Sequence, residues 1–329
     1  MILGIETSCD ETAVALVTGD GDVRSNVVAS QAELHARYGG VVPEVASRRH
    51  LELVGPVLVE ALEEAAATLD DVEAVAVTRG PGLIGALLVG LSAAKALAWS
   101  RRLPLVPVDH LEGHVCANWL LDEEPELPAL ALVVSGGHTE LMLMLDHGRF
   151  ERLGGTRDDA AGEAFDKVAR LLGLGYPGGP PLSRLAATAE ERSLRLPRAW
   201  LRGTDDFSFS GLKTAVVQLV AGEAPPAAEV AWAFEESVVD VLSRKAARAA
   251  EREGVASLLL AGGVAANRRL REVVRERSAV TVHIPPPALC TDNAAMIGAA
   301  AFRHLDDARP AEQPLDIYPT AKRSPRATP

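Results

Sequence analysis

Two stretches of the sequence share one pattern, in which an apolar strand, a short polar turn and a second apolar strand follow one another. The first is MILGIETSCDETAVALV at residues 1–17, and the second is LALVVSGGHTELMLML at residues 130–145. A unit that recurs near the start and near the middle of a 329-residue chain indicates an internal duplication. We therefore expect an α/β protein with two related domains, each opened by one of these hairpins.

Alternating helices and strands follow each hairpin. Apolar residues recur at intervals of three and four over residues 49–69, which predicts a helix, and a second apolar helix is expected over residues 83–100. The final predicted helix follows CTDN, with Thr291 or Asp292 as its N-cap. We expect an N-terminal domain over 1–128, with the closing helix 293–306 packing back on it, a C-terminal domain over 129–292 and a flexible tail over 307–329.

Charge and cysteine content restrict the class of protein. The net charge of −12 argues against unaided binding of nucleic acid, because phosphate contacts need Lys and Arg. Cys9, Cys116 and Cys290 form no CxxC pair, so neither a disulfide framework nor a thiolate zinc site is expected. No signal peptide is recognisable, and the longest apolar stretch carries Lys95 and is too short for a membrane span. We expect a soluble cytoplasmic protein.

Two glycine turns indicate a nucleotide-like ligand. SGGH at residues 135–138 and AGGVAAN at residues 261–267 each follow a predicted strand, and the second opens a helix. Glycine-rich turns and helix N-termini present backbone N–H groups that bind phosphate. One such turn is weak evidence. Two at strand ends favour a nucleotide ligand, which open α/β sheets bind at the carboxyl ends of their strands.

A histidine pair predicts a metal site. His110 and His114 in HLEGH would lie on one face of a helix, one turn apart. The zinc-protease motif needs a glutamate directly after the first histidine, but Leu111 stands there and Glu112 comes one residue later. Asp292 in CTDN is a candidate third ligand, because two imidazoles and one carboxylate leave open positions for substrate oxygens. The spacing alone does not show that these residues meet.

Eight motifs occur in the order found in one known family. GIETSCDETAVAL, HARYGGVVPEVASRRH, HLEGH, VSGGHTEL, GEAFDKVARLLGLGYPGGP, FSFSGLKTAV, AGGVAANRRLR and CTDNAAMI together resemble the tRNA threonylcarbamoyladenosine synthesis family TsaD/Kae1, formerly called Gcp or O-sialoglycoprotein endopeptidase. The likeness runs from Met1 to about Arg303. It implies the actin-like ATPase (ASKHA) fold, with two related α/β domains around a cleft.

The resemblance also implies a reaction and a set of site residues. The threonylcarbamoyl group of threonylcarbamoyl-AMP passes to the exocyclic amine of the adenosine 3′ of the anticodon in tRNAs that read ANN codons, and AMP leaves. One divalent metal ion, Fe²⁺ or else Zn²⁺, is held by residues matching His110, His114 and Asp292. Asp10 and Glu11 match acidic residues near the reacting group, and either could take the proton of the amine. The substrate-binding residues match Val134, Ser135, Gly136, Gly137, His138, Asp166, Gly179 and Asn267.

The resemblance further implies partners, and it leaves some questions open. We expect a smaller paralogue of the TsaB type, an ATPase of the TsaE type, and the tRNA anticodon loop. Archaeal and eukaryotic relatives have a tyrosine ligand where this chain has Val133, so the fourth metal position is open to water, Ser135 or substrate. Lys322, Arg323 and Arg326 could touch tRNA. The alternatives are a small-molecule kinase of the same superfamily, a metalloprotease and a non-catalytic subunit of a tRNA complex.

Overall fold

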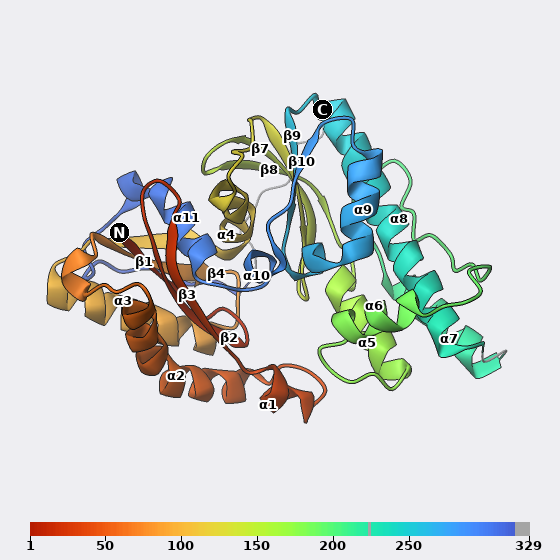
Figure 1. Cartoon of the computed structure of the whole chain (residues 1–329), viewed down its shortest axis with the longest axis horizontal. Helices are drawn as coiled ribbons and strands as arrows, with labels where there is room; N and C mark the ends of the chain where they lie inside the picture. Colours follow the sequence, from red (N-terminus) through yellow and green to blue (C-terminus); the bar gives the residue numbers. More distant parts are fainter. Residues whose placement is uncertain (223–224, 320–329) are drawn as a thin grey trace. The chain divides into compact units, whose positions relative to one another are not determined.

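The structure is a computed structural model that describes residues 1–222 and 225–319 (Figure 1). Its contacts divide the chain into two compact units. Of the described residues, the first comprises Met1–Glu124 and 288–319, and the second comprises those within Pro125–Pro287. Asp292 therefore belongs to the first unit, although the sequence places it at the end of the C-terminal domain. The reason is that the chain has already returned to the first unit before CTDN, at the short helix α10 (Pro287–Cys290).

A five-stranded sheet forms the centre of the first unit, with strand order β3-β2-β1-β4-β5. Strands β1, β2 and β3 pair antiparallel, whereas β4 and β5 continue the sheet parallel to β1. The elements of this unit are β1 (Ile2–Glu6), β2 (Glu11–Val17), β3 (Val23–Ser30), α1 (Ala32–Ala36), α2 (Pro43–Glu64), η1 (Leu69–Asp71), β4 (Ala74–Gly80), α3 (Ile84–Arg101), β5 (Leu105–Asp109), α4 (His110–Cys116), η2 (Ala117–Leu120), α11 (Ala295–Phe302) and η4 (Leu305–Asp307).

Alternate residues of β1 enter two different cores, because successive side chains of a strand point to opposite faces. Leu3 and Ile5 pack with residues of α2 and α3, whereas Ile2 packs with residues of α11. Helix α11 approaches β1 closely at Gly4, where a Cβ would lie 2.5 Å from the carbonyl oxygen of Ala294. A larger residue at this position would push the helix off the sheet.

The second unit has its own five-stranded sheet, with strand order β10-β9-β6-β7-β8. Its elements are β6 (Ala129–Val134), β7 (Thr139–Asp146), β8 (Arg149–Gly155), α5 (Ala161–Leu171), α6 (Gly179–Ala187), α7 (Ser210–Gly222), α8 (Ala227–Glu253), β9 (Ser257–Ala261), η3 (Gly263–Ala266), α9 (Arg268–Arg277) and β10 (Thr281–His283). In the described chain, no helix is both long and apolar enough to cross a bilayer.

The two sheets have the same topology. In each, the first three strands of the unit pair antiparallel in chain order, and the fourth and fifth join parallel on the other side of the first strand. The recurring hairpins are β1–β2 and β6–β7, and each lies at the centre of its sheet. The predicted duplication into two related α/β domains is therefore confirmed.

The chain after α11 does not leave the first unit at once. The sequence predicts a flexible tail over 307–329, and this prediction is wrong as far as Tyr318. Arg309 pairs with Leu105 at the edge of β5, Ala311 is buried in the core beneath α3, and the Tyr318 hydroxyl donates to Oδ2 of Asp109 at 2.8 Å. Apolar side chains fix this segment in place. Lys322, Arg323 and Arg326 lie outside the described residues.

Candidate metal centre and nucleotide site

Helix α4 presents the two histidines of HLEGH. Asp109 caps this helix, because its Oδ1 accepts hydrogen bonds from the backbone N–H groups of Leu111 and Glu112 at 2.9 and 3.1 Å. The imidazole rings of His110 and His114 lie edge to face, with centroids 4.6 Å apart. Gly113 lies between them because a Cβ there would come within 2.9 Å of Ile297 on α11. Helix α4 therefore packs closely against α11 at Gly113.

Asp292 reaches the histidines just before α11 begins. The predicted N-cap role of Thr291 or Asp292 is wrong. The first N–H groups of α11 are instead satisfied by side-chain oxygens, with Asn26 accepting from Ala294 and Ala295, and Asn293 accepting from Met296. Because other side chains cap the helix, the Asp292 carboxylate is available to the histidine pair.

The three predicted metal ligands meet at one point. Oδ1 of Asp292 lies 3.1 Å from Nε2 of His114 and 3.7 Å from Nε2 of His110, and the candidate ligand atoms all lie within 4.8 Å of one another. Bonds of about 2.0–2.2 Å from one cation to these atoms would give separations of this size. Two neutral imidazoles and one carboxylate on a buried surface fit a divalent transition metal, with positions left for further oxygen ligands.

A buried carboxylate orients the first of the two histidines. Oε2 of Glu6, at the end of β1, lies 3.0 Å from Nδ1 of His110, and the same oxygen accepts from the Thr78 hydroxyl at 2.6 Å. This bond turns Nε2 of His110 toward Asp292 and increases the basicity of the ring, as carboxylates behind metal-binding histidines commonly do. The Nδ1 atom of His114 is buried and has no hydrogen-bond partner in the described chain. The sequence reasoning missed Glu6, although a charge in the apolar run ILGIE was a signal.

Negative charge dominates the site. Burial lowers the pKa of His110, but the charges of Glu6 and Asp292 outweigh burial and raise that pKa to about 9. Burial, together with the charges of Asp292 and Asp10, raises the pKa of Glu11 to about 10. Neighbouring carboxylates that lack enough positive charge to balance them contribute to both shifts, whereas burial adds to the shift of Glu11 and opposes that of His110. A bound divalent cation would supply that charge.

The loop between β1 and β2 carries the two candidate proton acceptors. Asp10 and Glu11 hydrogen-bond to each other, and the charge of Asp292 acts on Glu11, so both acids lie near the metal ligands. His50 on α2 supports the loop from behind, because its Nε2 lies 3.0 Å from the carbonyl oxygen of Cys9 and its Nδ1 lies 2.8 Å from the Thr12 hydroxyl.

Glu112 does not occupy the position of a protease base. Its carboxylate lies 2.7 Å from Nε2 of His304, beyond the end of α11, and only 7% of the residue is exposed. This contact belongs to the packing of α4 against the end of α11. The geometry therefore gives no support to the metalloprotease alternative.

In the second unit, the turn Ser135–His138 joins β6 to β7. The Ser135 hydroxyl accepts from the backbone N–H of His138 at 3.1 Å, which closes the turn. No heavy atom lies within 4 Å of a Cβ placed on Gly136 or Gly137, so a ligand could approach the backbone at both glycines. Behind the turn, Gly262 has φ +87°, and a Cβ on it would lie 2.4 Å from the carbonyl oxygen of Val134. The second glycine turn thus packs against the strand that carries the first.

Asp166, in the middle of α5, contacts the start of α6, where Gly179 lies. Oδ1 of Asp166 accepts from the backbone N–H of Gly178 at 2.7 Å, so one oxygen of this carboxylate holds the start of α6. Gly179 begins α6, and the space next to its Cα is open. The N-terminus of α5 lies against the SGGH turn, because Gly162 N–H donates to the carbonyl oxygen of Ser135 at 3.1 Å. The predicted nucleotide residues are thus joined through α5 and α6.

Asn267, which is predicted to bind the substrate, makes three hydrogen bonds within the second unit. Its Oδ1 accepts from the backbone N–H of Leu270 at 2.8 Å and caps α9. Its Nδ2 donates to the Ser183 hydroxyl on α6 at 3.0 Å and to Oε1 of Glu235 on α8 at 2.7 Å. The sequence analysis missed Ser183 and Glu235, the two polar partners of Asn267. A serine or a glutamate in a helix is usually exposed, so neither residue was predicted to be part of a site.

Comparison with known proteins agrees with this geometry. Residues 22–299 match the family described as TsaD: tRNA N6-adenosine threonylcarbamoyltransferase. A protein of that name from Symbiobacterium thermophilum is 57% identical over 309 residues, covering 92% of this chain and 91% of its own. Another from Bacillus cereus is 55% identical over 329 residues, covering 97% and 95%. The chain belongs to the tRNA N6-adenosine threonylcarbamoyltransferase family. It is therefore a transferase that acts in tRNA modification.

Solved structures at low identity confirm the actin-like fold. Component A of the (R)-2-hydroxyglutaryl-CoA dehydratase of Acidaminococcus fermentans is 15% identical with a TM-score of 0.58, covering 93% of this chain and 98% of its own. HypF of T. kodakarensis is 15% identical with a TM-score of 0.61, covering 93% of this chain and 48% of its own. These likenesses concern the fold, not the ligand.

Val133 and the arginines of α9 bear on how the family's site is built here. Val133 lies within β6 and has no side-chain donor for a metal. Helix α9 carries three arginines near its start, of which Arg271 donates to the backbone carbonyls of Ala265 and Pro285, and Arg269 pairs with Glu236. The Arg268 side chain is 93% exposed. Arg271 therefore serves the packing of α9, and Arg268 is the most accessible of the three.

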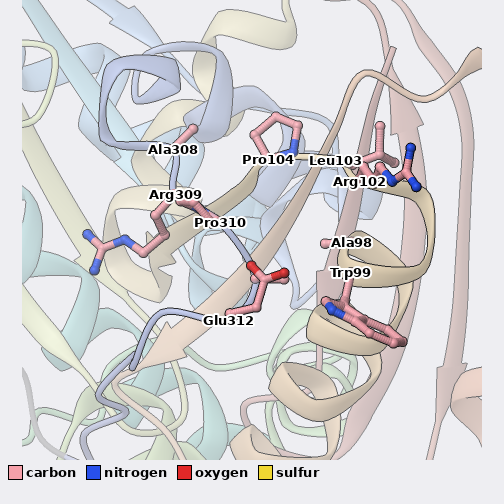
Figure 2. Close-up of a pocket in the computed structure, with 10 residues that line it drawn as sticks. Ala98, Trp99, Arg102, Leu103, Pro104, Ala308, Arg309, Pro310 and Glu312 are labelled. Carbon is pink, nitrogen blue, oxygen red and sulfur yellow. The ribbon is translucent and has the colours of Figure 1, made fainter.

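A separate hollow of about 420 Å³ lies in the first unit (Figure 2). Trp99 and Arg102, at the end of α3, form one side, and the segment from Ala308 to Glu312 forms the other. None of the predicted site residues lines this hollow. It is a product of the way the last described segment packs on α3.

Proposed function

We propose that the chain transfers the threonylcarbamoyl group from threonylcarbamoyl-AMP to the N6 amine of the adenosine 3′ of the anticodon in tRNAs that read ANN codons. The convergence of His110, His114 and Asp292, in a chain of this family, is the observation that carries the proposal. In the reaction, a bond forms between N6 and the carbamoyl carbon, and the bond from that carbon to the phosphate oxygen breaks. AMP leaves with the bonding electrons, and the amine loses one proton.

The metal fits the donor set. We propose that one Fe²⁺ ion, or else Zn²⁺, binds at His110, His114 and Asp292, because two histidines and a carboxylate form the facial set typical of non-haem Fe²⁺. The bound ion would polarise the mixed anhydride and stabilise negative charge on the departing phosphate. With the ion bound, Glu6 would accept from Nδ1 of His110 and so leave Nε2 to bind the metal.

The remaining roles belong to side chains and backbone groups of the chain. Backbone N–H groups between Val134 and His138 would donate to the phosphate oxygens, and Asp166 would accept from a ribose hydroxyl. Gly179 leaves room for the nucleotide at the start of α6. Either Asp10 or Glu11 would take the proton of the attacking amine. We further propose that the chain catalyses this transfer in the cytoplasm, together with a TsaB-like paralogue and a TsaE-like ATPase.

The direct test is nucleoside mass spectrometry of tRNA after incubation with preformed threonylcarbamoyl-AMP and the two partner proteins. We expect threonylcarbamoyladenosine with the unaltered chain and none with Asp292→Ala. Asp10→Asn and Glu11→Gln separate the two candidate bases, provided that each variant still binds the adenylate. If both variants transfer at the normal rate, neither acid is the base. If phosphate is transferred to a sugar without tRNA, the kinase alternative is correct.

A further inference from the structure

The side chain of Asn267 has no N–H group left for a ligand. An asparagine side chain offers two N–H donors and one acceptor oxygen. Both donors are used within the second unit, on Ser183 at 3.0 Å and on Glu235 at 2.7 Å, and the oxygen caps α9. If the nucleoside is read here by a side chain, the reading group must be one that Asn267 holds in place.

Glu235 is the better-placed group. It lies on α8, only 6% of it is exposed, and it lines a hollow of about 460 Å³ together with Ser183 and Trp232. An ionised carboxylate can accept about four hydrogen bonds. Hydrogen bonds from Asn267 and Ser183 account for two of them. The carboxylate therefore keeps acceptor capacity where it faces the hollow.

The other acids that line the hollow are paired with arginines. Glu236 pairs with Arg269, and Glu272 pairs with Arg268. No ion pair of Glu235 is found in the described chain, and burial raises its pKa above the ordinary value despite the bonds from Ser183 and Asn267. The charge of Arg269 acts on Glu235, but no ion pair joins the two in the described chain. A buried carboxylate without a direct ion pair gains most from a ligand that donates a hydrogen bond.

We propose that Glu235 reads the base of the adenylate, accepting a hydrogen bond from the exocyclic N6 amine of adenine, and that Asn267 is a positioning residue that fixes Glu235 and Ser183. The inference rests on the proposed function, which places an adenylate in this unit. Of the groups on adenine, the amine is the one that donates, and an acceptor-only carboxylate complements it. Trp232 lines the same hollow, and the Arg195 guanidinium lies over its ring at 5.3 Å from the centroid, so a purine would contact the indole on a part that Arg195 does not cover.

The test compares two nucleotides that differ only in the amine. Binding of AMP and of purine riboside 5′-monophosphate, which lacks the N6 group, is measured by calorimetry on the full-length chain. We expect the unaltered chain to prefer AMP by about 10- to 100-fold, the range for a hydrogen bond to a charged group. In Glu235→Gln the preference should fall to about one, because Asn267 holds the amide oxygen and the amide N–H₂ then faces the base amine.

Control variants separate recognition from stability. Glu236→Gln removes a neighbouring charge from the same helix and the same hollow, and we expect it to keep the preference for AMP. Asn267→Ala should lower the preference, and a thermal melt shows whether each variant is folded. Equal binding of the two nucleotides by the unaltered chain, or an unchanged preference in Glu235→Gln, would overturn the inference. So would equal weakening of both nucleotides in Glu235→Gln.

Failure of this inference and failure of the proposed function give different experimental results. A chain that prefers AMP through Glu235 but does not modify tRNA contradicts the function and supports the inference. A chain that modifies tRNA but binds both nucleotides equally contradicts the inference alone. A chain that binds neither nucleotide contradicts both.

Discussion

Replacing Glu6 by glutamine tests whether the buried carboxylate behind His110 supports the metal site. The change keeps the size of the side chain but removes the charge that lies 3.0 Å from Nδ1 of His110. Removing such an outer partner costs about 10- to 100-fold in metal affinity. At about 1.4 kcal/mol per factor of ten, this corresponds to about 1.4–2.8 kcal/mol. The burial of Glu6, with 0% exposure, favours the upper part of this range, because water cannot replace the lost charge.

The assay is competition for Fe²⁺ or Zn²⁺ against a chelator of known affinity, with a urea melt of each metal-free variant as the check on folding. Glu112→Gln is the matched control, because Glu112 is also buried, lies on α4 between the two histidines and faces His304. We expect it to bind metal as the unaltered chain does. If Glu6→Gln binds with unchanged affinity, or if Glu112→Gln loses as much, then orientation of His110 by Glu6 is not what stabilises the site.

Three further predictions concern stability. Gly262→Ala should destabilise the chain to urea by more than about 1 kcal/mol, because φ is +87° and the new Cβ would meet Val134, whereas Gly136→Ala, with open space, should cost less. The hydrogen bond to Glu112 raises the pKa of His304 from 6.5 to about 8, so the stabilisation by this bond is complete below pH 6.5 and is lost as the pH rises through 8. In urea melts at a series of pH values, His304→Gln should not show this loss of stability. If the variant and the unaltered chain have the same pH dependence, the prediction is wrong. Dialysis against a chelator should lower Tm. Metal added at a hundred times Kd should raise the free energy of unfolding by about 2.7 kcal/mol and restore Tm. No response of Tm to metal would contradict a resident ion.

Much of the fold follows from local pattern. The alternation of apolar runs and glycine turns marks the strands of both sheets, and the recurrence of the hairpin predicts that the two units are alike. The path after α11 could not be predicted in the same way. Leu315, Ile317 and Tyr318 stand among Pro, Asp and Gln. The first two pack against the core of the first unit, and Tyr318 packs against Gly80, on surfaces that exist only in the folded unit.

The site shows the same division between local and distant information. The spacing of His110 and His114 is enough to predict a shared helix face, but Asp292 lies 178 residues from His114, and only the family resemblance connects them. Glu235 could not be predicted at all. It occurs in a helix rich in charged residues, and its burial comes from the packing of α6 and α9 against α8. Long-range packing decides which of many similar glutamates becomes part of a site.

The divided course of the first unit constrains the order in which the protein can be completed during translation. The second unit is one continuous stretch, Pro125–Pro287, and can condense as soon as it leaves the ribosome. The first sheet, although made earliest, must wait for α11 to cover Ile2 and the neighbouring apolar surface. Asp292 lies in that same late segment, so a nascent chain acquires the third of its proposed metal ligands only when the segment that leads into α11 has been synthesised.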